Sequence, residues 1–319
     1  MSAAREFEVL TIGRVSVDLY PEQMGVPLAD VLTFRKSLGG SPTNVAVAAA
    51  RLGRRSAVVT KVGADGFGTY VHQALTGFGV DDRWVGCDPD LRTPLAFCEI
   101  HPPDSFPLLF YREPRAPDLN LTPADLDLAQ VRRAALFWTT GTGLSQEPSR
   151  GTTLEAMAGR PAGFTVHDLD YRPNLWQSSR GEAGRLAREA ASLSKVVVGN
   201  QDEVEMATGS REPERAATAL LDLGVELAVI KLGPHGVYAR SARETIVVPP
   251  VPVRVVCGLG AGDAFGGALC HGLLAGWPLE RVIRFANVAG AIVASRLACA
   301  DAMPDATEVE ALLEVNVHA

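Results

Sequence analysis

The chain has 319 residues and a formal net charge of −7 at pH 7, with apolar and charged contents typical of globular proteins. This length suits one large α/β domain or two smaller ones, and the composition argues against disorder. No cluster of lysines and arginines stands out against the acidic background, which argues against a nucleic-acid partner. An anionic substrate would therefore need arginines placed locally at its site.

The five cysteines are scattered, odd in number and without a C-x-x-C pair, which favours reduced thiols over a disulfide framework or a zinc site. Near the N-terminus, Glu6 and Glu8 stand where a signal peptide would be basic and then apolar. No apolar run approaches the roughly 20 residues that a membrane span needs. We therefore expect a soluble cytoplasmic protein with no membrane partner.

Strand-like and helix-like segments alternate along the chain. The expected strands lie at 8–12, 56–62, 136–140, 196–199, 227–232 and 251–256. The last of them comes just before the helices that close the chain. The expected helices lie at 41–53 (with Ser41 as N-cap and Pro42 first in the helix), 67–78, 182–193, 213–223, 278–296 and 308–314. The region 91–110 has short apolar runs broken by prolines, which favours a hairpin or edge strands. Alternation of this kind predicts a largely parallel sheet covered on both faces, in one main domain spanning 1–319.

The run from Gly260 to Phe265 is predicted to be a strand-to-helix turn at the start of an amphipathic helix. A helix N-terminus offers unpaired N–H groups and the positive end of the macrodipole, which attract an anion. Two glycines let that backbone approach a ligand closely. Asp263 would stand beside the anion, either as a helix cap or as a base that accepts a proton during phosphoryl transfer. The turn alone does not separate these two interpretations.

The run from Gly39 to Asn44 also carries a glycine pair before a helix. Asn44 could hydrogen-bond a neutral polyol, because its side chain both donates and accepts. The alternative is a plain glycine turn followed by a capped helix.

Two further turns follow predicted strands. Asn200 and Glu203, three residues apart, would meet in the first turn of a helix and suit a hydrated Mg²⁺, or would simply form a capping pair. The run from Lys231 to Gly236 could wrap a nucleotide through its glycines, or could be an ordinary β-turn.

Two arginines are candidate ligands for a carboxylate, because a guanidinium can grip one through two hydrogen bonds. Arg172 follows the run Asp168 to Tyr171, and Arg112 follows Phe110 and Tyr111. For either arginine taken alone, a surface ion pair is the alternative. The histidines are isolated and suggest neither a metal cluster nor a catalytic triad.

Taken together, these motifs resemble those of the ribokinase-like (PfkB-type) carbohydrate kinases along essentially the whole chain. The two family signatures match at Gly39 to Asn44 and at Gly260 to Asp263, and the N-x-x-E pattern matches at Asn200 and Glu203. Within the family, the similarity is greatest to the 5-dehydro-2-deoxygluconokinases of myo-inositol breakdown. The stretches that carry it are Gly13 to Pro21, Gly39 to Gly53, Leu109 to Arg112, Asp168 to Pro173 with Trp176, and Ala298 to Pro304.

The resemblance implies a three-layer α/β/α sandwich with a small β-sheet lid formed approximately by 14–37 and 91–115. It also implies ATP and Mg²⁺ as cosubstrates and transfer of the γ-phosphoryl group to a primary hydroxyl of a sugar acid. The resemblance implies that Asp263 is the base and that Gly260, Ala261 and Gly262 form the anion hole. It implies that the sugar is bound by Asp18, Gly39, Gly40 and Asn44, and its acid group by Arg112 and Arg172. The nucleotide would lie along Lys231, Gly233, Gly236, Gly262, Asn200 and Asn287, and Mg²⁺ would be bound through water by Asn200 and Glu203. An exposed β lid in this family also suggests a homodimer.

One departure from the family concerns a monovalent cation. Many relatives have Asp-Thr where this chain has Cys257 and Gly258, and a thiol cannot replace that carboxylate as a ligand for K⁺. Activation by that route is therefore not expected, and monovalent-cation dependence stays open.

Three other functions compete with this hypothesis. A nucleotide-dependent dehydrogenase would use Gly258, Gly260 and Gly262 as a dinucleotide fingerprint, but only about sixty residues follow and Asp263 stands where glycine or alanine is wanted. A catalytically inactive sugar sensor on the same fold is disfavoured by the intact Asp263, Asn200 and Glu203. The third is a family member with another substrate, such as 2-keto-3-deoxygluconate or fructose.

Overall fold

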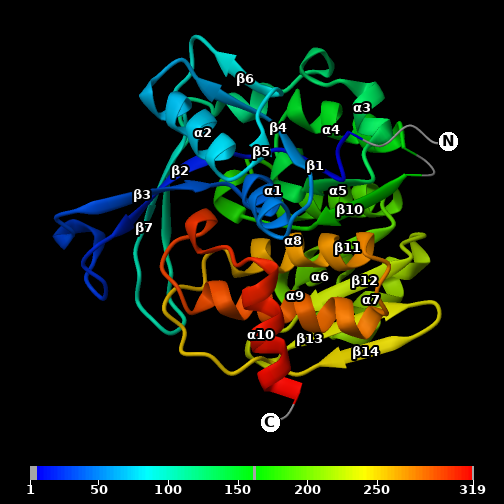
Figure 1. Cartoon of the computed structure of the whole chain (residues 1–319). Helices are drawn as coiled ribbons and strands as arrows, with labels where there is room; N and C mark the ends of the chain where they lie inside the picture. The colour runs from blue at the N-terminus through cyan, green and yellow to red at the C-terminus, as the bar shows by residue number, and fades with distance from the viewer. Residues whose placement is uncertain (1–5, 161–162, 318–319) are drawn as a thin grey trace.

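A computed structural model describes residues 6–160 and 163–317 as a three-layer α/β/α sandwich with a second, smaller sheet beside it (Figure 1). The large sheet is parallel except at one edge, where β13 and β14 run antiparallel. In spatial order its strands are β14 (Thr245–Val248), β13 (Val237–Ser241), β12 (Leu227–Lys231), β11 (Val196–Asn200), β10 (Phe164–Asp168), β9 (Leu136–Thr140), β1 (Val9–Ile12), β4 (Ser56–Gly63) and β5 (Val80–Asp81), with β6 (Val85–Asp88) also paired to β4.

Helices cover both faces of the large sheet. The face that includes Trp138 and Val58 packs against α1 (Ser41–Arg51), α2 (Gly66–Gly77), α8 (Ala261–Leu274), α9 (Leu279–Ala294) and α10 (Ala306–Val317). The face that includes Phe137 and Ile230 packs against α3 (Leu128–Arg133), α4 (Ser149–Ala158), α5 (Arg180–Ser192), α6 (Gln201–Thr208) and α7 (Pro213–Asp222). In the described residues, no helix combines the length and the apolar character that crossing a bilayer requires.

The small sheet stands at one side of the sandwich (Figure 1). Its strands, in order, are β3 (Phe34–Gly39), β2 (Ser16–Pro21), β7 (Leu95–Cys98) and β8 (Leu108–Tyr111). Strand β2 pairs antiparallel with β3 and parallel with β7, so two segments far apart in the sequence form one sheet. The remaining regular elements are single 3₁₀ turns: η1 (Leu28–Asp30), η2 (Pro117–Asn120), η3 (Pro123–Asp125), η4 (Gly141–Leu144), η5 (Pro173–Leu175), η6 (Gly233–His235) and η7 (Ala300–Ala302).

The packing of α1 against α8 brings two distant motifs together. Both helices are rich in small residues, and a Cβ on Gly267 of α8 would lie only 2.4 Å from the Cβ of Ala48 in α1. Such close contact is possible only because Gly267 has no side chain. The first turns of the two helices consequently face one another, next to the carboxyl ends of the parallel strands.

Most expected elements are confirmed to within two residues of their ends, but two expectations are wrong. The N-cap of α1 is Gly40 and not Ser41, which is the first helical residue and whose side chain is used elsewhere. No strand forms at 251–256; the last strand, β14, ends at Val248, and α8 follows a segment without regular structure. Pro249, Pro250 and Pro252 explain this, since each removes a donor that a sheet ladder needs.

Candidate active site

Helix α8 presents its N-terminus to the centre of the molecule with Asp263 in its first turn. The residue before the helix, Gly260, has φ +81°, and a Cβ there would lie 2.8 Å from the Sγ of Cys299. Only glycine meets both demands without strain. At the start of α8, a helix of 14 residues, the N–H of Ala261 makes a long hydrogen bond of 3.4 Å to the carbonyl of Gly258. The N–H groups of Gly262 and Asp263 have no backbone acceptor among the described residues and can receive a bound anion.

The carboxylate of Asp263 is held by two residues of α1. The Oγ of Ser41 donates to Oδ1 of Asp263 at 2.7 Å, and Nδ2 of Asn44 donates to Oδ2 at 2.8 Å. Burial raises the pKa of Asp263 to about 6, and the nearby Asp170 and Asp168 add to the rise, while these two hydrogen bonds lower it. The result is a fixed carboxylate that is ionised at neutral pH and more basic than a free aspartate.

Gly39 and Gly40 join the end of β3 in the small sheet to the start of α1. Gly40 has φ +98°, and a Cβ on it would lie 2.4 Å from the carbonyl oxygen of Arg14. A Cβ on Gly39 would lie 2.1 Å from Oδ1 of Asp18 in β2. Burial raises the pKa of Asp18, whose Oδ1 accepts a hydrogen bond from Ser16 at 2.7 Å. The structure thus brings Asp18, the glycine pair and Asn44 to one place.

Lys231, at the end of β12, lies beside the N-terminus of α8. A Cβ on Gly262 would lie 3.3 Å from Nζ of Lys231, and Nζ is 3.7 Å from Oδ1 of Asp168. Burial opposes the charge of Lys231, but Asp168, Glu203 and Asp263 together hold its pKa above the ordinary value. A permanent positive charge therefore stands next to the helix terminus, as an anionic phosphate would require.

Asn200 and Glu203 form a capping box at the start of α6. Oδ1 of Asn200 accepts from the N–H of Glu203 at 3.0 Å, and Oε2 of Glu203 accepts from the N–H of Asn200 at 2.7 Å. The capping alternative is therefore real, yet it uses only one oxygen of Glu203. Burial raises the pKa of Glu203 to about 7, with Lys231 opposing the rise and Asp168 adding to it.

Asn200 and Glu203 leave most of a divalent ion's coordination to other groups. Across residues 6–160 and 163–317, no three His, Cys, Asp or Glu side chains are grouped as a metal cage. That donor set fits Mg²⁺, which keeps several waters and binds through one or two carboxylates plus phosphate.

The two predicted arginines differ in their surroundings. Nη2 of Arg112 lies 2.5 Å from Oδ1 of the buried Asp118, and 9% of the arginine side chain is exposed. Oδ2 of Asp118 also accepts from the N–H of Val15 at 3.1 Å. Arg172 is more open, with 45% of its side chain exposed, and its Nε lies 3.4 Å from Oδ1 of the buried Asp170. Neither arginine forms an ordinary surface ion pair, because the carboxylate with which each one pairs is buried.

The remaining predicted nucleotide residues lie near the antiparallel edge of the large sheet. Gly233 and Gly236 form the tight 3₁₀ turn between β12 and β13. Asn287 of α9 donates a hydrogen bond to the carbonyl of Pro249 at 2.8 Å, so it fixes the segment that follows β14.

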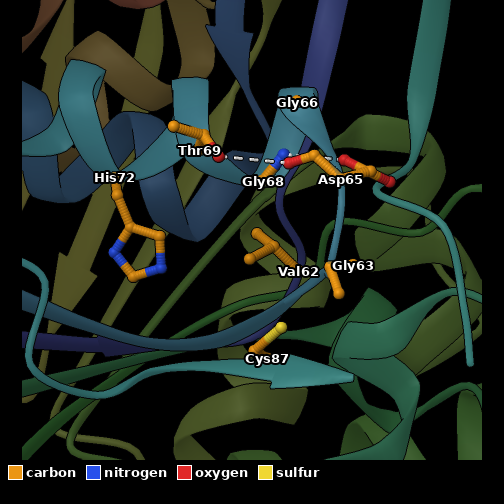
Figure 2. A pocket seen from close by; sticks show the side chains of 9 residues that line it. Val62, Gly63, Asp65, Gly66, Gly68, Thr69, His72 and Cys87 are labelled. Atoms are coloured by element: carbon orange, nitrogen blue, oxygen red, sulfur yellow. Dashed lines mark hydrogen bonds between the residues drawn. The ribbon is translucent and has the colours of Figure 1, made fainter. Parts of the chain in front are cut away.

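A hollow of about 450 Å³ lies away from this group, at the start of α2 (Figure 2). It is lined by Val62, Gly63, Ala64, Asp65, Gly66, Gly68, Thr69, His72 and Cys87. The carboxylate of Asp65 already accepts hydrogen bonds from Gly68 and Thr93, and none of the predicted site residues borders the hollow. We therefore do not assign it to the site.

Sequence reasoning missed several members of the group around Asp263. Ser41 belongs to a recognised motif but was expected only to cap α1, and Asp170 stands two residues before Arg172. Asp118 and Arg14 belong to no recognised motif of the site, because the contacts that matter, of Asp118 with the N–H of Val15 and of Arg14 with Asp170, join distant parts of the chain.

A fixed carboxylate beside a helix N-terminus and a lysine can remove a proton from a hydroxyl while a phosphoryl group is bound there. The fold and this arrangement are those of a phosphotransferase. Residues 6–306 match the family model "pfkB family carbohydrate kinase". The chain belongs to the pfkB family of carbohydrate kinases, and it is an ATP-dependent sugar kinase.

Individual relatives cover nearly the whole chain. A 5-dehydro-2-deoxygluconokinase from Shouchella clausii is 34% identical over 97% of this chain and 96% of its own length. A sugar kinase from Pyrococcus horikoshii, solved in complex with ATP, has a TM-score of 0.80 and 28% identity over 95% of this chain and 99% of its own. A fructokinase double mutant from Vibrio cholerae O395, solved with fructose, ADP and potassium, has a TM-score of 0.86 and 27% identity over 98% and 100%.

Proposed function

We propose that this chain transfers the γ-phosphoryl group of ATP to the terminal primary hydroxyl of 5-dehydro-2-deoxy-D-gluconate. The observation that carries the proposal is the carboxylate of Asp263, held by Ser41 and Asn44 at the N-terminus of α8. Full-length relatives with about a third of their residues identical bear the name of this activity. Arg112 and Arg172, each beside a buried carboxylate, offer guanidinium donors to the acid group of the substrate.

In the proposed mechanism, Asp18, Gly39, Gly40 and Asn44 hold the sugar so that its hydroxyl lies against Asp263. Phosphoryl transfer passes through a loose transition state, so positioning and charge stabilisation dominate. Asp263 takes the hydroxyl proton as the new bond to phosphorus forms. The N–H groups from Gly260 to Gly262 and the ammonium of Lys231 stabilise the negative charge on the transferred group.

ATP would lie along Lys231, Gly233, Gly236 and Asn287, with its last phosphate at α8. Asn200 and Glu203 would hold Mg²⁺ through water, and the ion neutralises phosphate charge when bound. The second oxygen of Glu203, which the capping box leaves free, is the group suited to that contact.

We further propose that the small sheet acts as a lid and as the contact of a homodimer, in a cytoplasmic enzyme formed as one domain. On the side of the sheet opposite Asp18, the rings of Phe34, Phe97 and Tyr111 pack edge to face. Tyr111 and Leu109 are about half exposed there. An apolar face of this kind is suited to a second copy of the same sheet.

An ATP-consumption screen tests the substrate directly. The purified chain is assayed with 5-dehydro-2-deoxygluconate, 2-keto-3-deoxygluconate, fructose and ribose, and we expect the first to give the highest kcat/KM. A higher value for 2-keto-3-deoxygluconate or fructose would move the activity to that branch of the family. No turnover with any sugar, combined with a sugar-dependent rise in Tm, would identify a sensor instead.

A further inference from the structure

Arg14 is a buried arginine that the proposed mechanism does not use. It follows Gly13 at the carboxyl end of β1, and only 10% of its side chain is exposed. Its guanidinium stands 5.7 Å from the ring centroid of Phe110 in β8. The N–H of the next residue, Val15, donates to the carboxylate of Asp118, which pairs with Arg112. Arg14 therefore belongs to the same part of the site as the predicted carboxylate ligand Arg112.

Two N–H donors in this region have no acceptor. Nε of Arg14 and Nη1 of Arg112 are buried, and neither has a hydrogen-bond partner among the described residues. A buried donor without an acceptor is costly, and the cost is larger for a charged group. Arginines kept in this condition on neighbouring elements are suited to an acceptor that arrives with the substrate.

The arginines of this group share their carboxylate partners. Three guanidinium groups, those of Arg14, Arg112 and Arg172, face two carboxylates. Asp118 pairs with Arg112, while Asp170 is shared: its Oδ2 lies 4.0 Å from Nη2 of Arg14, and its Oδ1 lies 3.4 Å from Nε of Arg172. The buried carboxylate of Asp18 also faces Arg14, although the two make no ion pair among the described residues. What remains for a substrate carboxylate is the pair of unsatisfied donors, Nε of Arg14 and Nη1 of Arg112.

Asp170 is held rigidly between its two arginines. Its backbone has φ +27°, which is rare for a residue with a side chain, and Thr142 donates a hydrogen bond to its Oδ2 at 2.7 Å. Backbone strain of this kind persists only where the surroundings enforce it, and it is frequent at binding sites. The shared, fixed carboxylate keeps Arg14 and Arg172 apart and oriented.

We propose that Arg14 binds the carboxylate of the sugar-acid substrate together with Arg112, and that Asp170 positions Arg14 for this contact. The inference rests on the proposed function, since it needs a substrate with an acid group. It makes Arg14 a specificity residue that separates sugar acids from neutral sugars.

The test compares Arg14→Gln with wild type on two substrates. These are 5-dehydro-2-deoxygluconate and its neutral analogue, in which a hydroxymethyl group replaces the carboxylate. We expect kcat/KM for the acid to fall by about 10- to 100-fold, the range for one hydrogen bond to a charged group. The value for the neutral analogue should change by less than about threefold. Arg132→Gln, at an exposed arginine of α3, is the matched control and should behave as wild type.

Binding without ATP provides a second readout. The dissociation constant of the acid, measured by calorimetry, should rise by the same factor in Arg14→Gln. Arg14→Lys keeps the charge but not the Nε donor, so its dissociation constant should lie between those of wild type and Arg14→Gln. If Arg14→Gln melts much lower than wild type, Arg14→Lys replaces it in the test.

The outcomes separate the two proposals. Suppose that wild type phosphorylates the acid, while an Arg14 variant (Arg14→Gln or Arg14→Lys) loses turnover of the acid and of the neutral analogue equally, or loses neither. Arg14 then does not bind the carboxylate, and the proposed function stands. If wild type has a higher kcat/KM for the neutral analogue than for the acid, the proposed substrate is wrong, and the proposed role of Arg14 is wrong as well.

Discussion

The side-chain amide of Asn44 donates a hydrogen bond to the carboxylate of Asp263 at 2.8 Å, across 219 residues of sequence. Asn44 was expected to bind the sugar, and this contact shows that it also orients the proposed base. Its own Oδ1 is buried and has no hydrogen-bond partner among the described residues, so it remains able to accept from a substrate hydroxyl. One side chain can therefore couple the position of the sugar to that of the base.

Replacing Asp263 by asparagine should remove the base and leave the fold intact, because an amide preserves the shape: its oxygen can accept from Asn44, and its NH2 can donate to the hydroxyl of Ser41. We expect kcat to fall by about 10²- to 10⁴-fold, the usual range for general-base catalysis, with ATP affinity nearly unchanged. Turnover and calorimetric ATP binding measure the two effects. Asp90→Asn, at an exposed loop carboxylate, is the control, and near-normal turnover in Asp263→Asn would refute the assignment of the base.

The pH profile should have an acid limb near pH 6. Asp263 must be ionised to act, and its pKa is about 6, so kcat/KM should be about tenfold lower at pH 5 than on the plateau. Ser41→Ala removes a hydrogen bond that stabilises the carboxylate and should move the limb to higher pH, by about one pH unit if that bond is worth about 1.4 kcal/mol. A limb that stays in place in Ser41→Ala would mean that another group governs it.

Lys231→Met should impair phosphoryl transfer strongly. The ammonium lies beside Gly262 at the start of α8, so its loss should lower kcat by about 10²- to 10³-fold, as for one oxyanion donor. Lys195→Met is the matched control, because Lys195 precedes the amino end of β11, whereas Lys231 stands at the carboxyl end of the adjacent strand β12. Equal turnover in the two variants would place Lys231 outside the phosphate site.

Glu203→Gln separates the two roles of the capping pair. Glutamine can still accept the hydrogen bond from the N–H of Asn200, so Tm should hold, while the lost charge should raise the Mg²⁺ concentration for half-maximal activity several-fold. A drop in Tm with an unchanged Mg²⁺ requirement would leave only the structural role.

Arg112→Ala and Arg172→Ala should differ in stability. Removing Arg112 leaves the buried carboxylate of Asp118 without its cation, at a cost of about 3–5 kcal/mol, whereas the half-exposed Arg172 should cost about 1 kcal/mol or less. Urea unfolding measures both. In folded protein, Arg172→Ala should raise KM for the sugar acid at least tenfold more than KM for fructose; equal effects would remove Arg172 from the carboxylate site.

The sequence by itself determined the fold class and singled out most residues of the candidate site. The alternation of apolar strands with amphipathic helices follows from local periodicity. Glycine-rich turns such as Gly39 to Gly40 and Gly260 to Gly262 indicate places where another group approaches the backbone closely. Motifs in a fixed order also identified the carboxylate, the lysine and the two predicted arginines, because these residues belong to contiguous runs.

Only the tertiary structure decided how those runs meet. The contact of Ser41 and Asn44 with Asp263 depends on helix packing at Gly267, and the pairing of Lys231 with Asp168 depends on neighbouring parallel strands. Arg14 and Asp118 gain their roles from partners more than 90 residues away or in another sheet, a relationship that no local pattern encodes. The pKa of Asp263 likewise results from burial and from the proximity of Asp170 and Asp168 at the end of β10, which exist only in the folded chain.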